Sequence, residues 1–161
     1  MRATPYRFRA YEAEDFAAVA AMWVEAWSAT GLKVDFAARR PWLEAHLTSL
    51  AAAGVDVAVA MDEDGRCGGL MTIDRRSGEL DQLCVAVAAQ GGGLAKALLE
   101  EAKRRTGAEI CLSVNADNGR ALAFYKREGF QIVGDGVSAA GLATWRLAWR
   151  PIGRRGETDA P

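Results

Sequence analysis

Three consecutive glycines, at residues 91–93, separate an apolar run that ends at Val87 from a strongly helical run that follows. A glycine inside regular structure costs roughly 0.5–1 kcal/mol relative to alanine, so the chain loses stability here unless bare backbone is needed. The joint predicts a strand, a tight turn and a helix in immediate succession.

A strand that passes through glycines into a helix is suited to holding a phosphate group. The first N–H groups of the helix have no partner within it and lie at the positive end of its dipole, and glycine lets an anion approach the backbone. Lys96 adds a positive charge in the first turn. The P-loop pattern is absent, and G-x-G-x-x-G fails because Lys96 stands where its last glycine belongs. By itself the joint leaves two alternatives, a phosphate site and a plain tight turn.

Hydrophobic periodicity and turn residues divide the rest of the chain into strands and helices. Helices are expected at residues 12–31, from Asp35 to Gly54, at 93–106 and between Asn118 and Gly129. Strands are expected at residues 4–11, 55–61, 66–74, 79–87, 109–114, 130–133 and 142–149. The order β-αα-βββ-α-β-α-ββ predicts an α/β (α+β) protein with a mixed sheet covered by helices, not a doubly wound nucleotide fold.

Length and composition are those of one ordinary soluble domain, expected over residues 1–150, with a polar tail at 151–161 expected to be disordered. The formal net charge of −1 gives no basic field for nucleic acid, and no apolar stretch approaches the roughly 20 residues of a membrane span. The N-terminus shows no apolar leader segment, so a cytoplasmic location is expected. Three cysteines without metal-ligand spacing and a single histidine argue against a metal site.

Two motifs give the glycine joint a specific context. The segment QGGGLA at residues 90–95 fits Q/R-x-x-G-x-G/A, and NGRALAFYKREGF at 118–130 fits N-x-x-A-x-x-F-Y-x-x-x-G-F. In this order and separation they resemble the signatures of the GNAT N-acetyltransferases, and the element order extends the resemblance over roughly residues 6–150. The chain departs from the family pattern at Val87, where proline is frequent, and at Ala95, where glycine is commoner.

The resemblance implies a GNAT fold, with a mostly antiparallel sheet of six to seven strands and a splayed central strand pair. It implies acetyl-CoA as co-substrate, with the pantetheine arm entering the splay and pairing with strand backbone. Leu83, Cys84 and Val85 would contact this arm, and the Val85 N–H would face the thioester oxygen. The pyrophosphate would lie on consecutive residues, namely Gln90, Gly91, Gly92, Gly93, Leu94, Ala95 and Lys96. Of the three glycines, the pattern requires Gly93, often has Gly91 and does not require Gly92.

Asn118 and Tyr125 are seven residues apart on one predicted helix, so they share a face at about 10.5 Å along its axis. The resemblance implies that one contacts the pantetheine arm and that Tyr125 protonates the departing thiolate; a tyrosine packed beside Phe124 is the alternative. Asn118 also suits the N-cap of this helix, and both roles can hold together. Asn115, at a strand end, suits either a cofactor contact or a bond within its own turn.

A base for the acceptor amine is harder to place. On the strand at residues 79–87, Asp81 shares the alternation of Leu83 and Val85, and it is our candidate base, directly or through a water. An exposed strand carboxylate without a catalytic role is the alternative. A bulge at this place would exchange the two faces of the strand.

The remaining candidates surround the predicted transfer site. His46 is expected to be a packed or surface residue of an apolar helix. Cys84 has no base near it in the sequence, which favours direct transfer in a ternary complex over an acyl-cysteine intermediate. Trp27 and Asp81 are candidate substrate contacts, although the spacing of Trp23 and Trp27 equally fits a packed core.

These features predict an acyltransferase that moves an acetyl group from acetyl-CoA to a primary amine on a small molecule or a peptide. The alternative is a non-catalytic acyl-CoA-binding regulatory module, which would keep the same cofactor site. Neither nucleic acid nor membrane is expected as a partner, and the chain is expected to be a monomer or a homodimer. The sequence contains no pattern that identifies the acceptor.

Overall fold

The computed structural model describes residues 5–151, so the tail predicted to be disordered lies outside the described residues except for Pro151. The strands are β1 (Arg7–Ala10), β2 (Asp56–Met61), β3 (Cys67–Ile73), β4 (Leu80–Val85), β5 (Ile110–Asn115), β6 (Gln131–Val137) and β7 (Ala143–Trp149). The helices are α1 (Phe16–Ser28), α2 (Arg40–Ala52), α3 (Leu94–Thr106) and α4 (Gly119–Arg127), and the 3₁₀ turns are η1 (Ala13–Asp15), η2 (Ala37–Arg39) and η3 (Val87–Ala89). This order confirms the predicted β-αα-βββ-α-β-α-ββ arrangement. Within residues 5–151, no helix combines the length and apolar character needed to span a bilayer.

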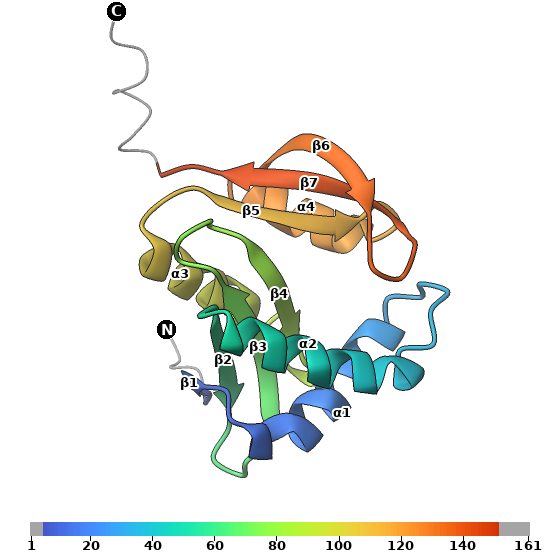
Figure 1. Ribbon diagram of the computed structural model, residues 1–161, viewed down its shortest axis with the longest axis vertical. Coiled ribbons are helices and arrows are strands. Elements are labelled where there is room, and N and C mark those ends of the chain that lie inside the picture. Colours follow the sequence, from blue (N-terminus) through green and yellow to red (C-terminus); the bar gives the residue numbers. More distant parts are fainter. Residues whose placement is uncertain (1–4, 152–161) are drawn as a thin grey trace, which may run out of the picture.

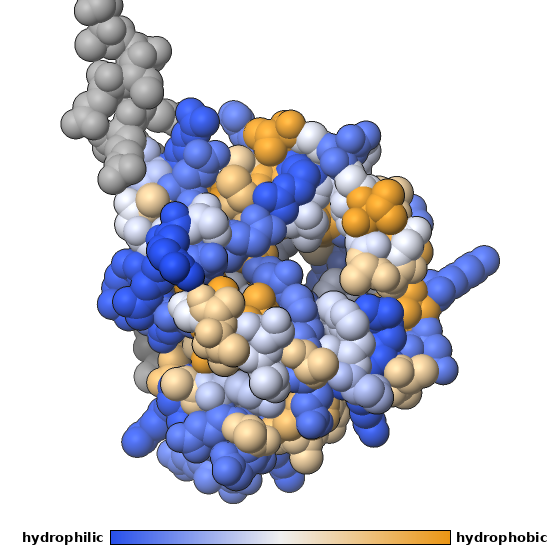
Figure 2. All heavy atoms as spheres, viewed as in Figure 1, coloured by the Kyte–Doolittle hydropathy of each residue, from blue (hydrophilic) through white to orange (hydrophobic). Residues whose placement is uncertain are grey.

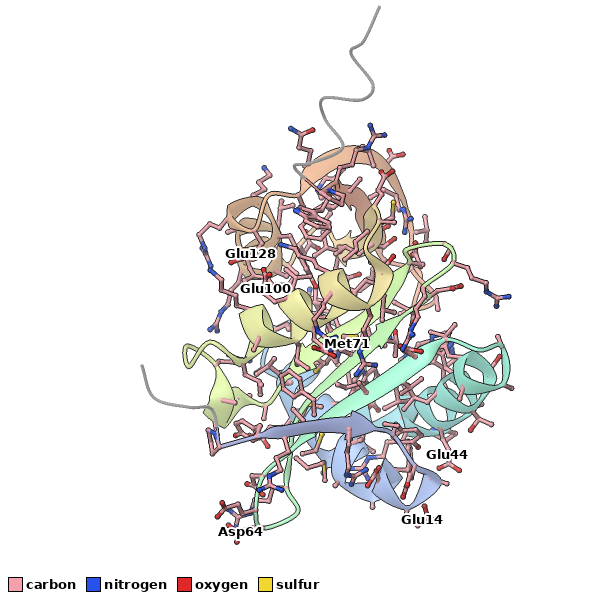
Figure 3. The ribbon with its side chains drawn as sticks, turned by 90° about the vertical axis from the view of Figure 1, so that its left-hand side faces the viewer. Glu14, Glu44, Asp64, Met71, Glu100 and Glu128 are labelled. Atoms are coloured by element: carbon pink, nitrogen blue, oxygen red, sulfur yellow. The ribbon has the colours of Figure 1, made fainter. Side chains whose placement is uncertain are left out.

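The first sheet is antiparallel, in the order β1-β2-β3-β4, and helices cover both of its faces (Figure 1). Helix α3 packs on the face that carries Met71, where Leu98 and Leu99 are buried (Figure 3). Helices α1 and α2 pack on the opposite face, where Leu43 of α2 and Leu70 of β3 belong to one buried cluster. Every residue of β3 is buried, which explains why that strand has no polar alternation.

The second sheet has the order β5-β7-β6 and is also antiparallel. Its inner face, with Leu112 and Leu147, packs against Tyr125 of α4 and Phe130. Strand β6 is an edge strand and is exposed along its whole length. Residues of the second sheet therefore belong to the same buried cluster as those of α3.

Strands β4 and β5 form a wedge between the two sheets, and Figure 1 shows β4 turning away from β5. They meet at one end through a single parallel bridge between Glu79 and Cys111. At this closed end a Cβ atom on Gly78 would overlap the Glu109 carbonyl oxygen, so only glycine allows the approach. The Arg146 guanidinium on β7 holds the Glu79 carboxylate with two bonds of 2.7 and 2.8 Å. The splayed strand pair predicted from the family resemblance is therefore confirmed.

Several predicted boundaries differ from the structure, including the end of β6, which was predicted at residue 133 and lies at Val137. Helix α2 begins at Arg40 and is preceded by the separate turn η2, to which the Asp35 carboxylate is tied by a hydrogen bond that it accepts from the Ala38 N–H at 3.1 Å. Pro41 then occupies the first turn of α2, where its missing N–H costs nothing. Strand β4 ends at Val85, and Val87 belongs to the turn η3.

Candidate functional site

Two adjoining cavities lie where β4 and β5 separate, and Figure 2 shows the surface hollowed between the second sheet and the helices α1 and α2. The wedge cavity, of about 420 Å³, lies between the strands and is bordered by Trp27, Trp42, His46, Asp81, Ser113 and Asn115. The glycine-loop cavity, of about 350 Å³, is bordered by Gly91, Gly93, Leu94, Ala95, Lys96, Arg120 and Arg127. The two share a wall made of Thr30, Leu83, Val85, Gln90, Asn118, Ala121 and Tyr125. A ligand can therefore extend from one cavity into the other along β4 and α4.

The glycine loop leads directly into α3. Gly91 and Gly93 have φ of +82° and +87°, a left-handed conformation that favours glycine, whereas Gly92 does not. Gly93 is the N-cap of α3, and no side chain caps this helix end. The loop geometry thus makes Gly91 as well as Gly93 a conformational requirement, and it leaves the first N–H groups of α3 available to an anion.

Three cations gather at this uncapped helix end. Lys96 was expected there, and Arg120 and Arg127 join it from α4. The Arg120 guanidinium donates to the Gln90 side-chain oxygen at 2.8 Å, which ties the start of the glycine loop to α4. Positive charge and free helical N–H groups together favour a phosphate-bearing ligand in the glycine-loop cavity.

The open edge of β4 presents backbone groups to the wedge. The Ala86 N–H donates to the Gly68 carbonyl of β3 at 2.8 Å. Since successive backbone groups of a strand point in opposite directions, the N–H groups of Val85 and Leu83 point away from β3 and into the wedge. The Cys84 side chain, in contrast, is buried against Met22 of α1. Cys84 nevertheless borders the wedge cavity, so a chain-like ligand that pairs with β4 passes close to this residue.

Tyr125 stands where the two cavities meet. Its ring is buried and packs edge-on against Phe124 and Phe130, so the side chain is held in one position. Burial raises the pKa of the Tyr125 hydroxyl well above its ordinary value, because the phenolate would lose its hydration. The hydroxyl therefore stays protonated at physiological pH and is available as a proton donor.

Both asparagines predicted for the site lie at the wedge. The Asn118 side-chain oxygen accepts from the Ala121 N–H at 3.2 Å, which confirms its role as N-cap of α4, and Asn118 also lines both cavities. The Asn115 side-chain oxygen is buried and has no hydrogen-bond partner among the described residues. It does not bond within its own turn, so one of the two predicted alternatives for this oxygen is excluded.

Asp81 lies on a β-bulge, which corrects its predicted face. Between β3 and β4, Thr72 pairs with Gln82 whereas Ile73 pairs with Leu80, so Asp81 is an extra residue in the ladder. The simple alternation that placed Asp81 with Leu83 fails at this point. The carboxylate instead faces α2, on the side of the sheet that α1 and α2 cover.

The Asp81 carboxylate is paired with the only histidine of the chain. His46 Nε2 lies 2.6 Å from Asp81 Oδ2, and the two side chains are 26% and 34% exposed, so protons can exchange with solvent. The His46 ring stacks on Trp42 at 4.6 Å with an interplanar angle of 13°. On Asp81, a second hydrogen bond of 3.3 Å comes from the Gln82 amide, which in turn accepts from the Trp23 N–H at 3.3 Å. These contacts fix the orientation of both members of the pair.

The aromatic and cysteine candidates divide between the wedge and the core. Trp27 and Trp42 line the wedge cavity, whereas Trp23 is buried in the cluster under α1. Burial raises the pKa of the Cys84 thiol to about 12, so no thiolate forms there near neutral pH. Cys67, also buried, has its pKa raised to about 11 for the same reason.

His46 packs on Trp42 and is partly exposed, as predicted, but the sequence did not predict that it pairs with Asp81 at the wedge cavity. His46 and Asp81 are 35 positions apart in the chain, on a helix and a strand whose docking no local pattern reveals. Arg120 and Arg127 were also missed, although a signal existed. They are seven residues apart on the helix of Asn118 and Tyr125, a spacing that puts both on one face.

Comparisons with known proteins agree with this geometry. A family model described as "Acetyltransferase (GNAT) domain" matches residues 43–150. A search of the curated proteins found no match.

Among solved structures, apo YjaB from Escherichia coli is 23% identical with a TM-score of 0.71, covering 91% of this chain and 98% of that chain. The PaiA N-acetyltransferase from Thermoplasma acidophilum, in complex with coenzyme A, is 17% identical with a TM-score of 0.76, covering 92% of this chain and 100% of that chain. A phosphinothricin acetyltransferase from Sinorhizobium meliloti, in complex with AcCoA, is 17% identical with a TM-score of 0.70, covering 91% of this chain and 89% of that chain.

Proposed function

The chain belongs to the GNAT acetyltransferase family, and on that premise we propose that it moves an acetyl group from acetyl-CoA to a primary amine by direct attack in a ternary complex. One observation carries the proposal. The uncapped N-terminus of α3, with Lys96, Arg120 and Arg127 around it, adjoins a wedge that holds a buried tyrosine and a paired carboxylate. An anion site and a proton-transfer site thus share one wall.

Acetyl-CoA fits the two cavities in one orientation. The pyrophosphate lies on the amides that begin α3, where each charge-assisted hydrogen bond is worth about 1.5–3 kcal/mol. The pantetheine arm runs along the shared wall and pairs with the free backbone edge of β4. The thioester carbonyl then lies near the Val85 N–H, which stabilises the developing oxyanion. The Asn115 side-chain oxygen, buried without a partner, is available to an N–H of a bound substrate.

Each proton in the reaction has an acceptor or donor in the wedge. The Asp81–His46 pair takes a proton from the substrate ammonium, and the freed amine nitrogen attacks the thioester carbon. As the C–N bond forms and the C–S bond breaks, Tyr125 gives its hydroxyl proton to the departing sulfur. The new amide nitrogen sheds its extra proton, which restores the Tyr125 hydroxyl. The thiol of CoA, with a pKa near 8.5, is a reasonably good leaving group, so Tyr125 needs only to donate a proton to the departing sulfur.

The state of Cys84 supports direct attack. A cysteine that carries an acyl group must first attack as a thiolate, and burial holds the pKa of Cys84 at about 12. Its sulfur contacts Met22 at 3.6 Å on the far side of β4 from the wedge face of Leu83 and Val85. No acyl-enzyme on this residue is needed when the amine and the thioester meet in one cavity.

We expect acetyl-CoA to bind and stabilise the protein, and an amine panel to release free CoA. At 100 times its Kd, acetyl-CoA adds about 2.7 kcal/mol to the free energy of unfolding, measured as a thermal shift. Thiol release is measured with a chromogenic disulfide, with acetyl-CoA and no amine as the control. Stabilisation without release from any amine would indicate the non-catalytic acyl-CoA-binding module, and no stabilisation at all would reject both.

If the Asp81–His46 pair is the base, substitution of either residue should lower kcat. Asp81→Asn removes the charge with little change of shape, and we expect kcat to fall by about 10²-fold or more while the Kd for acetyl-CoA is unchanged. His46→Gln should give a smaller loss in the same direction. Because the two act as one unit, the double variant should be no slower than Asp81→Asn alone.

Glu44→Gln is the matched control for this pair. Glu44 is an exposed carboxylate on α2, the helix of His46, and it lies outside both cavities (Figure 3). This variant should keep the full kcat. If the fall in kcat of the double variant equals the product of the two single falls, the two residues do not act as one proton acceptor. If Asp81→Asn and His46→Gln turn over as fast as Glu44→Gln, neither residue is the base.

A further inference from the structure

The walls of the wedge cavity carry no lysine or arginine. All of its lining residues lie within the described part of the chain, and Asp81 is the one acidic side chain among them, with His46 as its partner. The other polar side chains of the wall are neutral: Trp27, Thr30, Trp42, Gln82, Gln90, Ser113, Asn115, Asn118, Tyr125, Ser138 and Thr144. The charge of the acceptor end is therefore negative or zero, in contrast to the three cations at the glycine loop.

Neighbouring cations do not supply the missing positive charge. Arg146 approaches the cavity wall at Ser113 with a 3.0 Å hydrogen bond, but the Glu79 carboxylate already holds its guanidinium with two bonds. Arg39 lies over the Trp42 ring at 4.5 Å and is not part of the cavity wall. Arg120 lines the glycine-loop cavity and not the wedge, and its guanidinium is engaged with Gln90 in the wall that the two cavities share.

An anionic group on the acceptor would lose water in this cavity without gaining a cation. A carboxylate on the carbon next to the reacting amine would also lie near Asp81, because the amine must reach that carboxylate to lose its proton. A neutral group at the same position meets neither penalty. The wall offers it hydrogen-bonding partners, and the buried Trp27 N–H and Asn115 side-chain oxygen have none within the described protein.

We propose, on the basis of the transfer reaction above, that the acceptor is a primary amine whose neighbouring carbon bears no carboxylate or phosphate. The class comprises alkylamines, arylalkylamines and amino groups next to a neutral amide. Free α-amino acids lie outside it. The distinction follows from the charge of the wall and not from its size, since a carboxylate and a carboxamide have nearly the same shape.

Matched acceptor triples test this charge rule. Phenylalanine, phenylalaninamide and phenethylamine are compared by thiol release with saturating acetyl-CoA, as are leucine, leucinamide and isopentylamine. We expect kcat/KM for the amide and the amine to exceed that of the free acid by at least about tenfold, which equals a difference of 1.4 kcal/mol. A free acid that equals or exceeds its amide in either triple overturns the inference and leaves the transfer reaction standing. No acetylation in either triple, with acetyl-CoA bound, counts against both.

A charge-gain variant gives a second measurement. Ala139 is exposed in the turn between β6 and β7 and borders the wedge cavity, so Ala139→Arg adds a cation to its wall. The ratio of kcat/KM for phenylalanine to that for phenylalaninamide should rise at least about fivefold, whereas Ala139→Gln, of similar length and neutral, should leave the ratio unchanged. An equal ratio in both variants would overturn the claim that wall charge sets the preference.

Discussion

Replacing Tyr125 with phenylalanine is expected to lower kcat by about 10²–10⁴-fold and to leave acetyl-CoA binding intact. The substitution removes the hydroxyl that we propose as proton donor to the departing sulfur, while the ring keeps its edge-on contacts with Phe124 and Phe130. Thiol release gives kcat, and the acetyl-CoA thermal shift gives the binding readout. A fall in both together would indicate a packing role and not proton donation.

The pH dependence of this loss follows from the burial of the hydroxyl. Burial raises the pKa of Tyr125, so the group is already protonated at low pH and stays protonated as the pH rises through neutrality. The Tyr125→Phe deficit should therefore be the same from about pH 6 to about pH 9, below the ordinary tyrosine pKa of about 10. Tyr11→Phe is the control, because Tyr11 packs against the α1–α2 cluster and borders neither cavity. A deficit that disappears within this pH range would reject Tyr125 as the proton donor.

Local signals predicted most of the fold and the succession of strand, glycine loop and helix. The Asn118 side chain caps α4 as its position before the helix indicates, and Gly129 follows that helix with φ of +95°. The strand, the glycine loop and α3 succeed each other as the residue types predict, because glycine conformations and helix caps depend on near neighbours in the chain. Because these features depend on residues close together in the chain, they can be predicted from a single sequence.

The acceptor end depends on contacts between distant segments and was predicted less well. The predicted face of Asp81 was wrong because a regular strand places successive side chains on alternate faces, whereas the β-bulge opposite Thr72 adds one extra residue and breaks this alternation. The pairing of His46 with Asp81 was not predicted because it comes from the docking of α2 against the end of β4. The charge of the wedge wall is likewise a property of the assembled cavity. The acceptor class proposed above therefore rests on the assembled cavity and not on a local sequence pattern.

Gly93→Val is expected to lower the affinity for acetyl-CoA by about 100-fold or more, the equivalent of losing about two charge-assisted hydrogen bonds. Gly93 has φ of +87°, where a β-branched residue is strained by roughly 1–3 kcal/mol, so the loop shifts and misplaces the N–H groups that start α3. The measurement is the thermal shift across an acetyl-CoA titration, which separates lost affinity from lost stability.

The other end of α3 supplies the control for strain. Gly107 is the C-cap of the same helix, has φ of +60° and, like Gly93, has open space where a Cβ atom would stand. Gly107→Val should therefore destabilise the fold to a similar degree and keep the affinity for acetyl-CoA. Gly92→Lys tests the loop itself: Gly92 is not left-handed, and its Cβ would lie 3.3 Å from the Ala89 carbonyl oxygen, a contact that a small shift relieves. If Gly93→Val binds acetyl-CoA as well as these two variants do, the glycine loop is a turn without a role in holding phosphate, and the anion site must be sought elsewhere.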